Sequence, residues 1–141
     1  MKRILFTSTL AAALAAALFM TAHTVTAAPE GAPAPYRHVV LFKFKADAPK
    51  EKVAEVVKAF AGLKEKLPAV LSFEHGLNVS PEGINDGFTH VFTATFKDKA
   101  SLENHYLKEP AHEEFVKLIK PVIEKVLVVD YVANFVDHGA H

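Results

Sequence analysis

The stretch YRHVVLFKFK, residues 36–45, decides the fold, because its side chains alternate as they do along a strand. One face carries His38, Val40, Phe42 and Phe44, and the other carries Val39, Leu41, Lys43 and Lys45. Both faces hold apolar residues, so the sequence predicts a strand that is covered on two sides. His38 lies within this apolar run, where an imidazole needs a hydrogen-bond partner or a chemical role.

The rest of the chain predicts helices and strands in an order that defines a fold class. Pro110 separates two paired helices, because it disfavours helical geometry at Glu109 and suits the first turn of a new helix. The order is strand, helix, strand, strand, paired helices, strand, which predicts an α+β, ferredoxin-like, four-stranded antiparallel sheet with helices on one face. The remaining elements are a helix with Asp47 or Ala48 near its cap and Pro49 in its first turn, which Pro68 ends, and strands over 71–79 and 88–96. A short helix with Leu102 and Tyr106 on one side, a helix from Pro110 that Pro121 kinks or ends, and a strand over 126–136 complete the order.

The second face of this sheet has no helix to cover it. The first strand presents Val39 and Leu41 there, and the last strand is apolar on both faces apart from Asp130 and Asn134. An apolar sheet face of this size needs a partner surface. The pattern therefore favours an association that buries it.

The first residues are typical of an export signal. Lys2 and Arg3 precede an alanine-rich apolar stretch, and small residues then lead to a favoured cleavage site after Ala27. We therefore expect a signal peptide over 1–27, a Pro-rich linker over 28–35, one domain over 36–136 and a flexible tail over 137–141. A membrane anchor is the alternative, but the stretch falls short of roughly 20 strongly apolar residues, so we expect no stable anchor. The expected location is periplasmic or secreted.

Composition excludes several kinds of site. The chain has no cysteine, which excludes disulfides, a thiolate metal site and a thiol nucleophile. Without Lys2 and Arg3, its 16 basic residues become 14 against 16 acidic ones, a net charge of −2. No basic patch is visible, so we expect no nucleic-acid partner. The chain also lacks a Gly-rich phosphate loop and a nucleotide fingerprint, and we expect no cofactor.

His112 and Tyr106 are the candidate catalytic residues. If Pro110 opens a helix, His112 lies in its first turn, where the helix dipole favours a neutral ring; Glu113 and Glu114 oppose this. Tyr106 stands six residues earlier, which on one straight helix is a different face. A kink at the proline would let the phenol and the imidazole converge as an acid–base pair.

These segments resemble the stress-responsive A/B barrel domain family over residues 36–136. The resemblance is carried by His38 in RHVVLFKF, His90 in GFTHVFTATF and His112 in HYLKEPAHEEF, with Tyr106 upstream. It implies that a second copy of the sheet covers the open face, which makes a homodimeric α/β barrel. The family mixes enzymes with stress-induced stable dimers.

The resemblance also implies roles for single residues. A polyketide cyclase among the plant members carries out an intramolecular aldol condensation, and its proposed catalytic pair matches His112 and Tyr106. His38 and His90 match histidines near its site, which makes them pocket or structural residues. Two positions depart from the pattern: Phe60 replaces a tyrosine that lines the cyclase's pocket, and Glu109 replaces a histidine of many members.

A metal site at the histidines is the rival interpretation. The spacing of His38, His90 and His112 matches no compact ligand motif, so we expect no side-chain metal site. Both strand histidines come early in antiparallel strands and should lie toward opposite ends of the sheet, since six strand residues span roughly 20 Å. Some plant members hold a divalent cation through backbone carbonyls, which corresponds here to 67–70. His75 and His105 are expected to be partly exposed, without a role.

Three functions stay open from the sequence. The first is an exported dimer that binds a small apolar ligand or is associated with stress, without established chemistry. The second is a cofactor-free cyclase, lyase or isomerase acting on a small apolar acid or phenolic, with His112 as base and Tyr106 as donor. The third is a cofactor-free monooxygenase, since related dimeric ferredoxin-like barrels include such enzymes. A small apolar pocket between helices and sheet is expected in each case.

Overall fold

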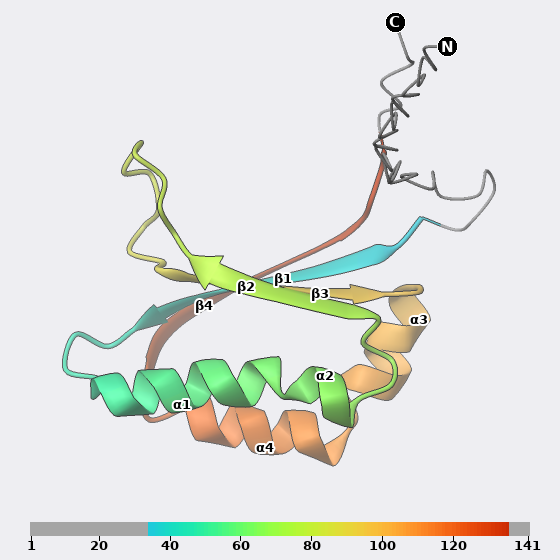
Figure 1. The fold of residues 1–141 in the computed structure, drawn as a ribbon, viewed down its shortest axis with the longest axis horizontal. Helices are drawn as coiled ribbons and strands as arrows, with labels where there is room; N and C mark the ends of the chain where they lie inside the picture. The colour runs from blue at the N-terminus through green and yellow to red at the C-terminus, as the bar shows by residue number, and fades with distance from the viewer. Residues whose placement is uncertain (1–33, 136–141) are drawn as a thin grey trace, which may run out of the picture. The chain divides into compact units, whose positions relative to one another are not determined.

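The computed structural model describes residues 34–135, and the helices and strands in that part of the chain follow the predicted order (Figure 1). The predicted signal peptide, most of the linker and the predicted tail lie outside the described residues. The elements are β1 (Tyr36–Phe44), α1 (Lys50–Ala61), α2 (Leu63–Lys66), β2 (Ser72–Leu77), β3 (His90–Phe96), α3 (Lys99–Ser101), the π-helical turn η1 (Leu102–Tyr106), α4 (Pro110–Ile119) and β4 (Ile123–Val132).

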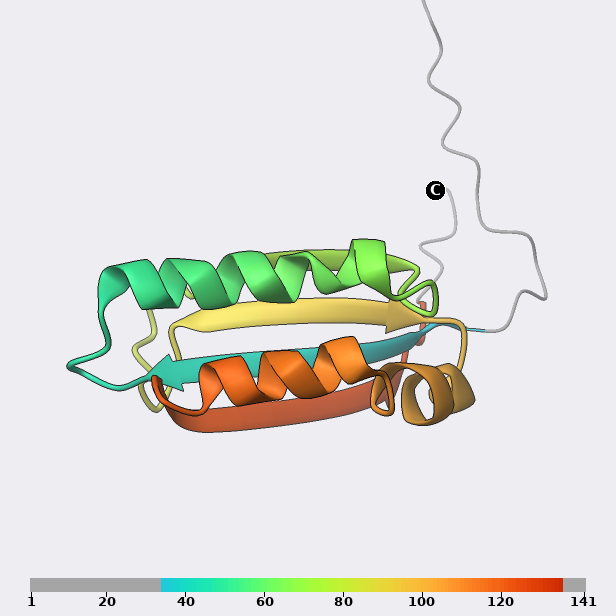
Figure 2. The same cartoon turned by 90° about the horizontal axis from the view of Figure 1, so that it is seen from below.

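The predicted ferredoxin-like sheet is confirmed. Its strand order is β2-β3-β1-β4, and every neighbouring pair is antiparallel. Figures 1 and 2 show α1 and α4 side by side across one face, with the α3–η1 segment at one end of that layer. In Figure 1, the loop between β2 and β3 rises on the side of the sheet opposite the helices. Helices therefore cover a single face, as the sequence predicts.

Several boundaries differ from the predicted ones. The first predicted helix is divided into α1 and α2 at Gly62. This residue caps the end of α1, where its N–H donates to the carbonyl of Lys58, and it also caps the start of α2. The last strand begins at Ile123 rather than at residue 126, since its pairing with β1 continues past a bulge to Phe44. Pro121 lies in the short turn between α4 and β4, so α4 ends directly before it.

The space between the helices and the sheet is filled by aromatic rings. Phe60 of α1 stacks on Phe115 of α4 with 4.4 Å between ring centroids, and it lies 4.6 Å from Phe92 of β3. Phe42 of β1 packs against the same rings. We call Phe42, Phe60, Phe92 and Phe115 the phenylalanine cluster. Their burial supplies much of the core, since each buried aromatic ring contributes on the order of 2 kcal/mol.

The edge strand β4 is apolar and open on both sides. Val128 on the helix-facing side is 49% exposed, and Val129 on the other side is 46% exposed. Side chains of this size seldom stay in water along a whole strand. Within residues 34–135, no helix is long and apolar enough to cross a membrane.

Candidate acid–base site

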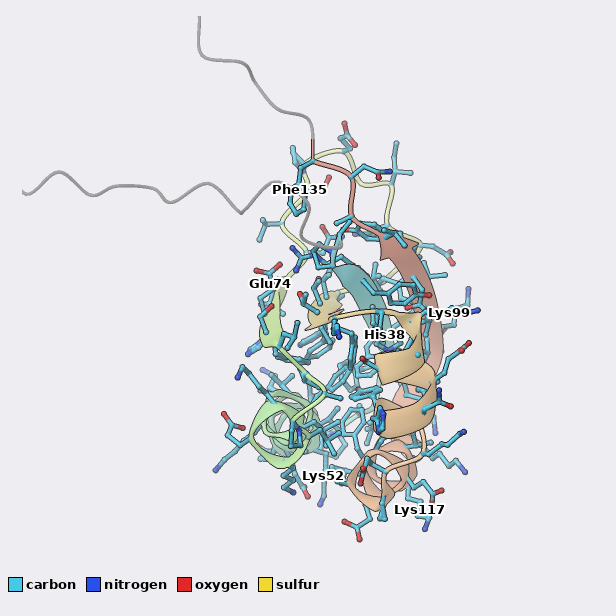
Figure 3. All side chains as sticks on the ribbon, turned by 90° about the vertical axis from the view of Figure 1, so that its right-hand side faces the viewer. His38, Lys52, Glu74, Lys99, Lys117 and Phe135 are labelled. Carbon is cyan, nitrogen blue, oxygen red and sulfur yellow. The ribbon has the colours of Figure 1, made fainter. Side chains whose placement is uncertain are left out.

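Three of the predicted site residues meet at one end of the helix layer. The ring of Tyr106 lies between two histidine rings, 5.7 Å from that of His38 and 4.7 Å from that of His112. Each residue comes from a different element: β1, η1 and α4. Figure 3 views this end of the molecule and shows His38 beside the α3–η1 segment. We call these three residues the His–Tyr–His cluster.

The turn between η1 and α4 explains why Tyr106 and His112 converge. Glu109 is extended, with φ −75° and ψ 136°, and Pro110 begins α4. The backbone N–H of His112 donates to the carbonyl of Glu109, which places His112 in the first turn of the new helix. The break redirects the chain, so the predicted kink is what brings the two rings together.

A π-helical turn precedes this break. The N–H of Leu107 donates to the carbonyl of Leu102 at 3.0 Å, five residues back. The segment is anchored at its start by Asp98, whose carboxylate accepts from the N–H of Ser101 at 2.8 Å. Turns of this kind are uncommon and often occur at functional sites. Here the turn carries Leu102 and Tyr106 into the core.

Asp130 is the site residue that the sequence did not reveal. Its Oδ1 lies 2.6 Å from Nδ1 of His38. A carboxylate only accepts, so Nδ1 of His38 donates and the ring is held in one orientation. The two residues are direct partners in the β1–β4 ladder. In the sequence, Asp130 was visible only as an acidic residue in an apolar strand. Its pairing with His38 depends on the register of β1 and β4, which lie far apart in sequence.

Tyr106 is buried with an unused hydroxyl. The residue is 1% exposed, and within the described part of the chain its OH has no hydrogen-bond partner. A buried hydroxyl without a partner costs about 1–3 kcal/mol. Burial also raises the pKa of the phenol well above its usual 10. Tyr106 is therefore a hydrogen-bond donor without an acceptor, and it stays protonated at working pH.

His112 is half-buried, and its surroundings favour the neutral ring. Burial lowers the pKa of His112 first, and the charge of His38 lowers it further. A backbone hydrogen bond with Leu107 and the charge of Glu113 oppose these effects without reversing them. The sequence left open whether the helix dipole or the acidic neighbours control the charge of His112. Burial, rather than either of these, favours the neutral ring. A neutral imidazole can accept a proton.

The pocket predicted between the helices and the sheet is filled in this structure. The phenylalanine cluster occupies that space, and Phe60, predicted as a pocket or structural residue, is one of its members. His112 reaches the surface in a shallow depression lined by Leu107, Glu113, Val116, Lys117 and Lys120. Tyr106 lies behind His112 in the packed core. The two rings are therefore adjacent, with His112 at this surface depression and Tyr106 behind it in the core.

His90 lies apart from the cluster, as the strand directions predicted. His38 pairs with Ala94 in the sheet, whereas His90 pairs with Phe42. The ring of His90 packs edge-on against Phe44, with 4.9 Å between centroids. Burial lowers the pKa of His90, and the charge of His75 adds to that effect.

No cluster of metal ligands takes the place of the acid–base site. Among residues 34–135, no group of three or more His, Asp or Glu side chains is placed to hold a metal ion. The segment 67–70 forms a turn in which the N–H of Val70 donates to the carbonyl of Leu67. A backbone cation site at this turn stays a prediction.

Comparison with known proteins decides the family. The sequence profile described as "Stress responsive A/B Barrel Domain" matches residues 36–133. The chain belongs to this family. The stress-response A/B barrel protein HS1 of Arabidopsis thaliana is 37% identical over 102 residues, which cover 72% of this chain and 93% of HS1. Olivetolic acid cyclase of Cannabis sativa is 27% identical over 95 residues, covering 67% and 93% of the two chains.

Solved structures of similar proteins agree in fold. The hydroxynitrile lyase of Passiflora edulis superposes with a TM-score of 0.67 at 28% identity, covering 72% of this chain and 95% of the lyase. A dimeric ferredoxin-like protein of Bacteroides fragilis superposes with a TM-score of 0.57 at 25% identity, covering 70% and 96%. The proteins similar to this chain thus include a stress-response protein, a cyclase, a lyase and dimeric proteins of unknown function.

Proposed function

We propose that this A/B barrel protein is a cofactor-free cyclase or lyase that acts on a small apolar carbonyl or phenolic compound. One observation carries the proposal: the Tyr106 hydroxyl is buried without an acceptor while its ring lies between those of His38 and His112. A substrate oxygen beside this hydroxyl would satisfy it. The cyclase and lyase among the similar proteins support the same reaction class.

The chemistry follows from the protonation states. The neutral His112 ring takes a proton from a carbon or a hydroxyl of the substrate. The electron pair left behind moves toward the substrate's carbonyl oxygen or expels a leaving group. Tyr106, which stays protonated, donates a hydrogen bond to the oxygen where negative charge develops. His112 then returns its proton to the product or the leaving group, so the reaction needs no external acid or base.

His38 and Asp130 support this step. The 2.6 Å contact fixes the His38 ring, whose edge faces the Tyr106 ring at 63°. A fixed neighbour keeps the phenol in place without a hydrogen bond of its own. We assign His38 a positioning role through Tyr106, and Asp130 a positioning role through His38.

A ligand-binding or stress-associated dimer without chemistry is the second candidate. The phenylalanine cluster favours it, because its rings fill the space between the helices and the sheet where a substrate was expected to bind. In this case, the His–Tyr–His cluster serves packing alone. The monooxygenase hypothesis has no equivalent observation in its favour.

Ligand binding separates the two candidates. Histidine ring signals of the protein are followed by NMR while benzaldehyde, a small apolar carbonyl compound, is added. The acid–base site predicts that the signals of His112 shift, and that Tyr106→Phe, which removes only the hydroxyl, abolishes the shift. If the signals of His112 stay fixed at saturating benzaldehyde, the acid–base proposal is wrong for carbonyl ligands and the second candidate stands.

The same proposal includes a homodimer and export. A second copy laid on the open face would bury the side of β4 that carries Leu127 and Val129, which are both about half exposed. The dimeric ferredoxin-like relatives support this arrangement. Export rests on the N-terminal sequence pattern, and mass spectrometry of the mature protein should show a chain that begins at Ala28.

A further inference from the structure

A second pair of histidines lies on the sheet, away from the His–Tyr–His cluster. In the β2–β3 ladder, His75 pairs with Phe92 and Leu77 pairs with His90. His75 and His90 are therefore diagonal neighbours on adjacent strands. Both side chains lie on the face of the sheet that carries Phe42 and Phe92. Diagonal neighbours have Cα atoms about 7–8 Å apart, within reach of each other's long side chains.

We propose that His75 and His90 form a two-histidine site for a divalent transition-metal ion such as Ni²⁺, Cu²⁺ or Zn²⁺. Imidazole nitrogens are preferred ligands of these ions, whereas Mg²⁺ and Ca²⁺ prefer oxygen. Two protein ligands leave the remaining coordination positions to water, which suits a site on the exposed edge strand β2. A site of this kind needs no third acidic or histidine ligand, which agrees with the absence of larger ligand groups among residues 34–135.

The two rings differ in freedom, because a hydrogen-bond partner holds His90 whereas the exposed ring of His75 can turn. Nδ1 of His90 lies 2.9 Å from Oγ1 of Thr89. When Nδ1 donates to that hydroxyl, Nε2 is the unprotonated nitrogen that can bind a metal, and such outer partners commonly orient metal-binding histidines. His75 stacks on Phe92 with 5.8 Å between centroids and is otherwise exposed, so its ring can turn toward His90.

The electrostatics agree with this geometry. Burial lowers the pKa of His90, and a positive charge on His75 lowers it further. Both effects favour the neutral form of the His90 ring, which is the form that binds a metal ion. The charged side chain nearest in sequence, Glu74, alternates to the opposite face of β2.

Isothermal titration of the metal-free full chain with Ni²⁺ tests the proposal. The tail histidines His138 and His141 are both changed to Gln in every sample, because they are a separate possible source of Ni²⁺ binding. The background protein should bind one Ni²⁺ per chain. Either His75→Gln or His90→Gln should remove that binding, while His105→Gln, a matched change at an exposed histidine of η1, should leave it intact.

A second measurement locates the ion. Substoichiometric Cu²⁺ broadens nearby NMR signals, so the ring signals of His75 and His90 should disappear before those of His105 and His112. Thermal unfolding of each variant confirms that it is folded, and His75→Gln changes only an exposed side chain. No Ni²⁺ binding by the background protein, or binding that survives both His75→Gln and His90→Gln, overturns the proposal.

Discussion

The ring of Tyr106 lies 4.7 Å from the ring of His112, although the two residues stand on separate helical segments on either side of a proline break. The break itself produces this contact. On one continuous helix, Tyr106 and His112 would lie on different faces. Because a new helix begins at Pro110, the chain changes direction and the two rings lie side by side. The acid–base proposal depends on this junction more than on either residue alone.

Replacement of Asp130 tests the support behind the cluster. Asp130→Ala leaves Nδ1 of buried His38 without its partner at 2.6 Å. We expect a loss of about 1–3 kcal/mol in the free energy of unfolding, measured by urea denaturation. The matched control is Glu55→Ala, which removes an exposed ion pair with Lys52 on α1 and should cost clearly less than Asp130→Ala. Equal costs for the two variants would show that the His38 contact is not structural support.

Truncation of Phe60 should open the filled core. Phe60→Ala removes a ring that stacks on Phe115, and a Phe→Ala change in a core typically costs about 3–5 kcal/mol. If the vacated space stays open, benzene should bind there and raise the melting temperature of the variant without affecting that of the native protein. In Phe60→Leu, which removes less volume, the rise in melting temperature caused by benzene should lie between that of Phe60→Ala and that of the native protein. A benzene effect of equal size on the native protein would contradict the filled core.

The pH dependence of stability has a defined sign. Because the pKa of His112 in the folded protein is lowered from 6.5, the unfolded chain binds more protons at mildly acidic pH. Stability contributed by the neutral ring is complete above about 6.5 and falls as the pH drops toward the folded value. In His112→Gln, this part of the decline should be missing, as measured by denaturation at pH 7.5 and pH 5. An unchanged slope would mean that the ring is not held neutral by the fold.

A charge on the open face should prevent dimer formation. Leu41 lies on the side of β1 that no helix covers, and Leu41→Glu would place a carboxylate in the proposed interface. Light scattering should give a dimer for the native protein at micromolar concentration, and a monomer or an unfolded chain for the variant. The control Glu55→Lys places a charge change on exposed α1 and should remain dimeric. A native protein with the mass of a monomer would contradict the homodimer.

The sequence predicted the elements and the convergence of Tyr106 with His112, but not the contacts that depend on strand register. Pro110 and the alternation in 36–45 are local signals, so the helix start and β1 followed from them directly. Asp130 was visible only as a polar residue in an apolar strand, because its partner His38 is defined by the β1–β4 register. Phe60 was predicted to be a pocket or structural residue, and only the structure shows that its ring stacks in the core, since side-chain packing across α1 and α4 is not encoded in local spacing.

Turnover of an aromatic cyanohydrin tests the acid–base proposal most directly. Mandelonitrile splits when its hydroxyl proton passes to a base and cyanide leaves, and the benzaldehyde formed is followed by its absorbance. We predict turnover by the native protein, its loss in folded His112→Ala, and a reduction of roughly 10²-fold or more in Tyr106→Phe. His105→Ala, a change at an exposed histidine of the same segment as Tyr106, should keep full activity. Turnover by folded His112→Ala at the native rate, or none by the native protein above the uncatalysed rate, would contradict a lyase site built on Tyr106 and His112.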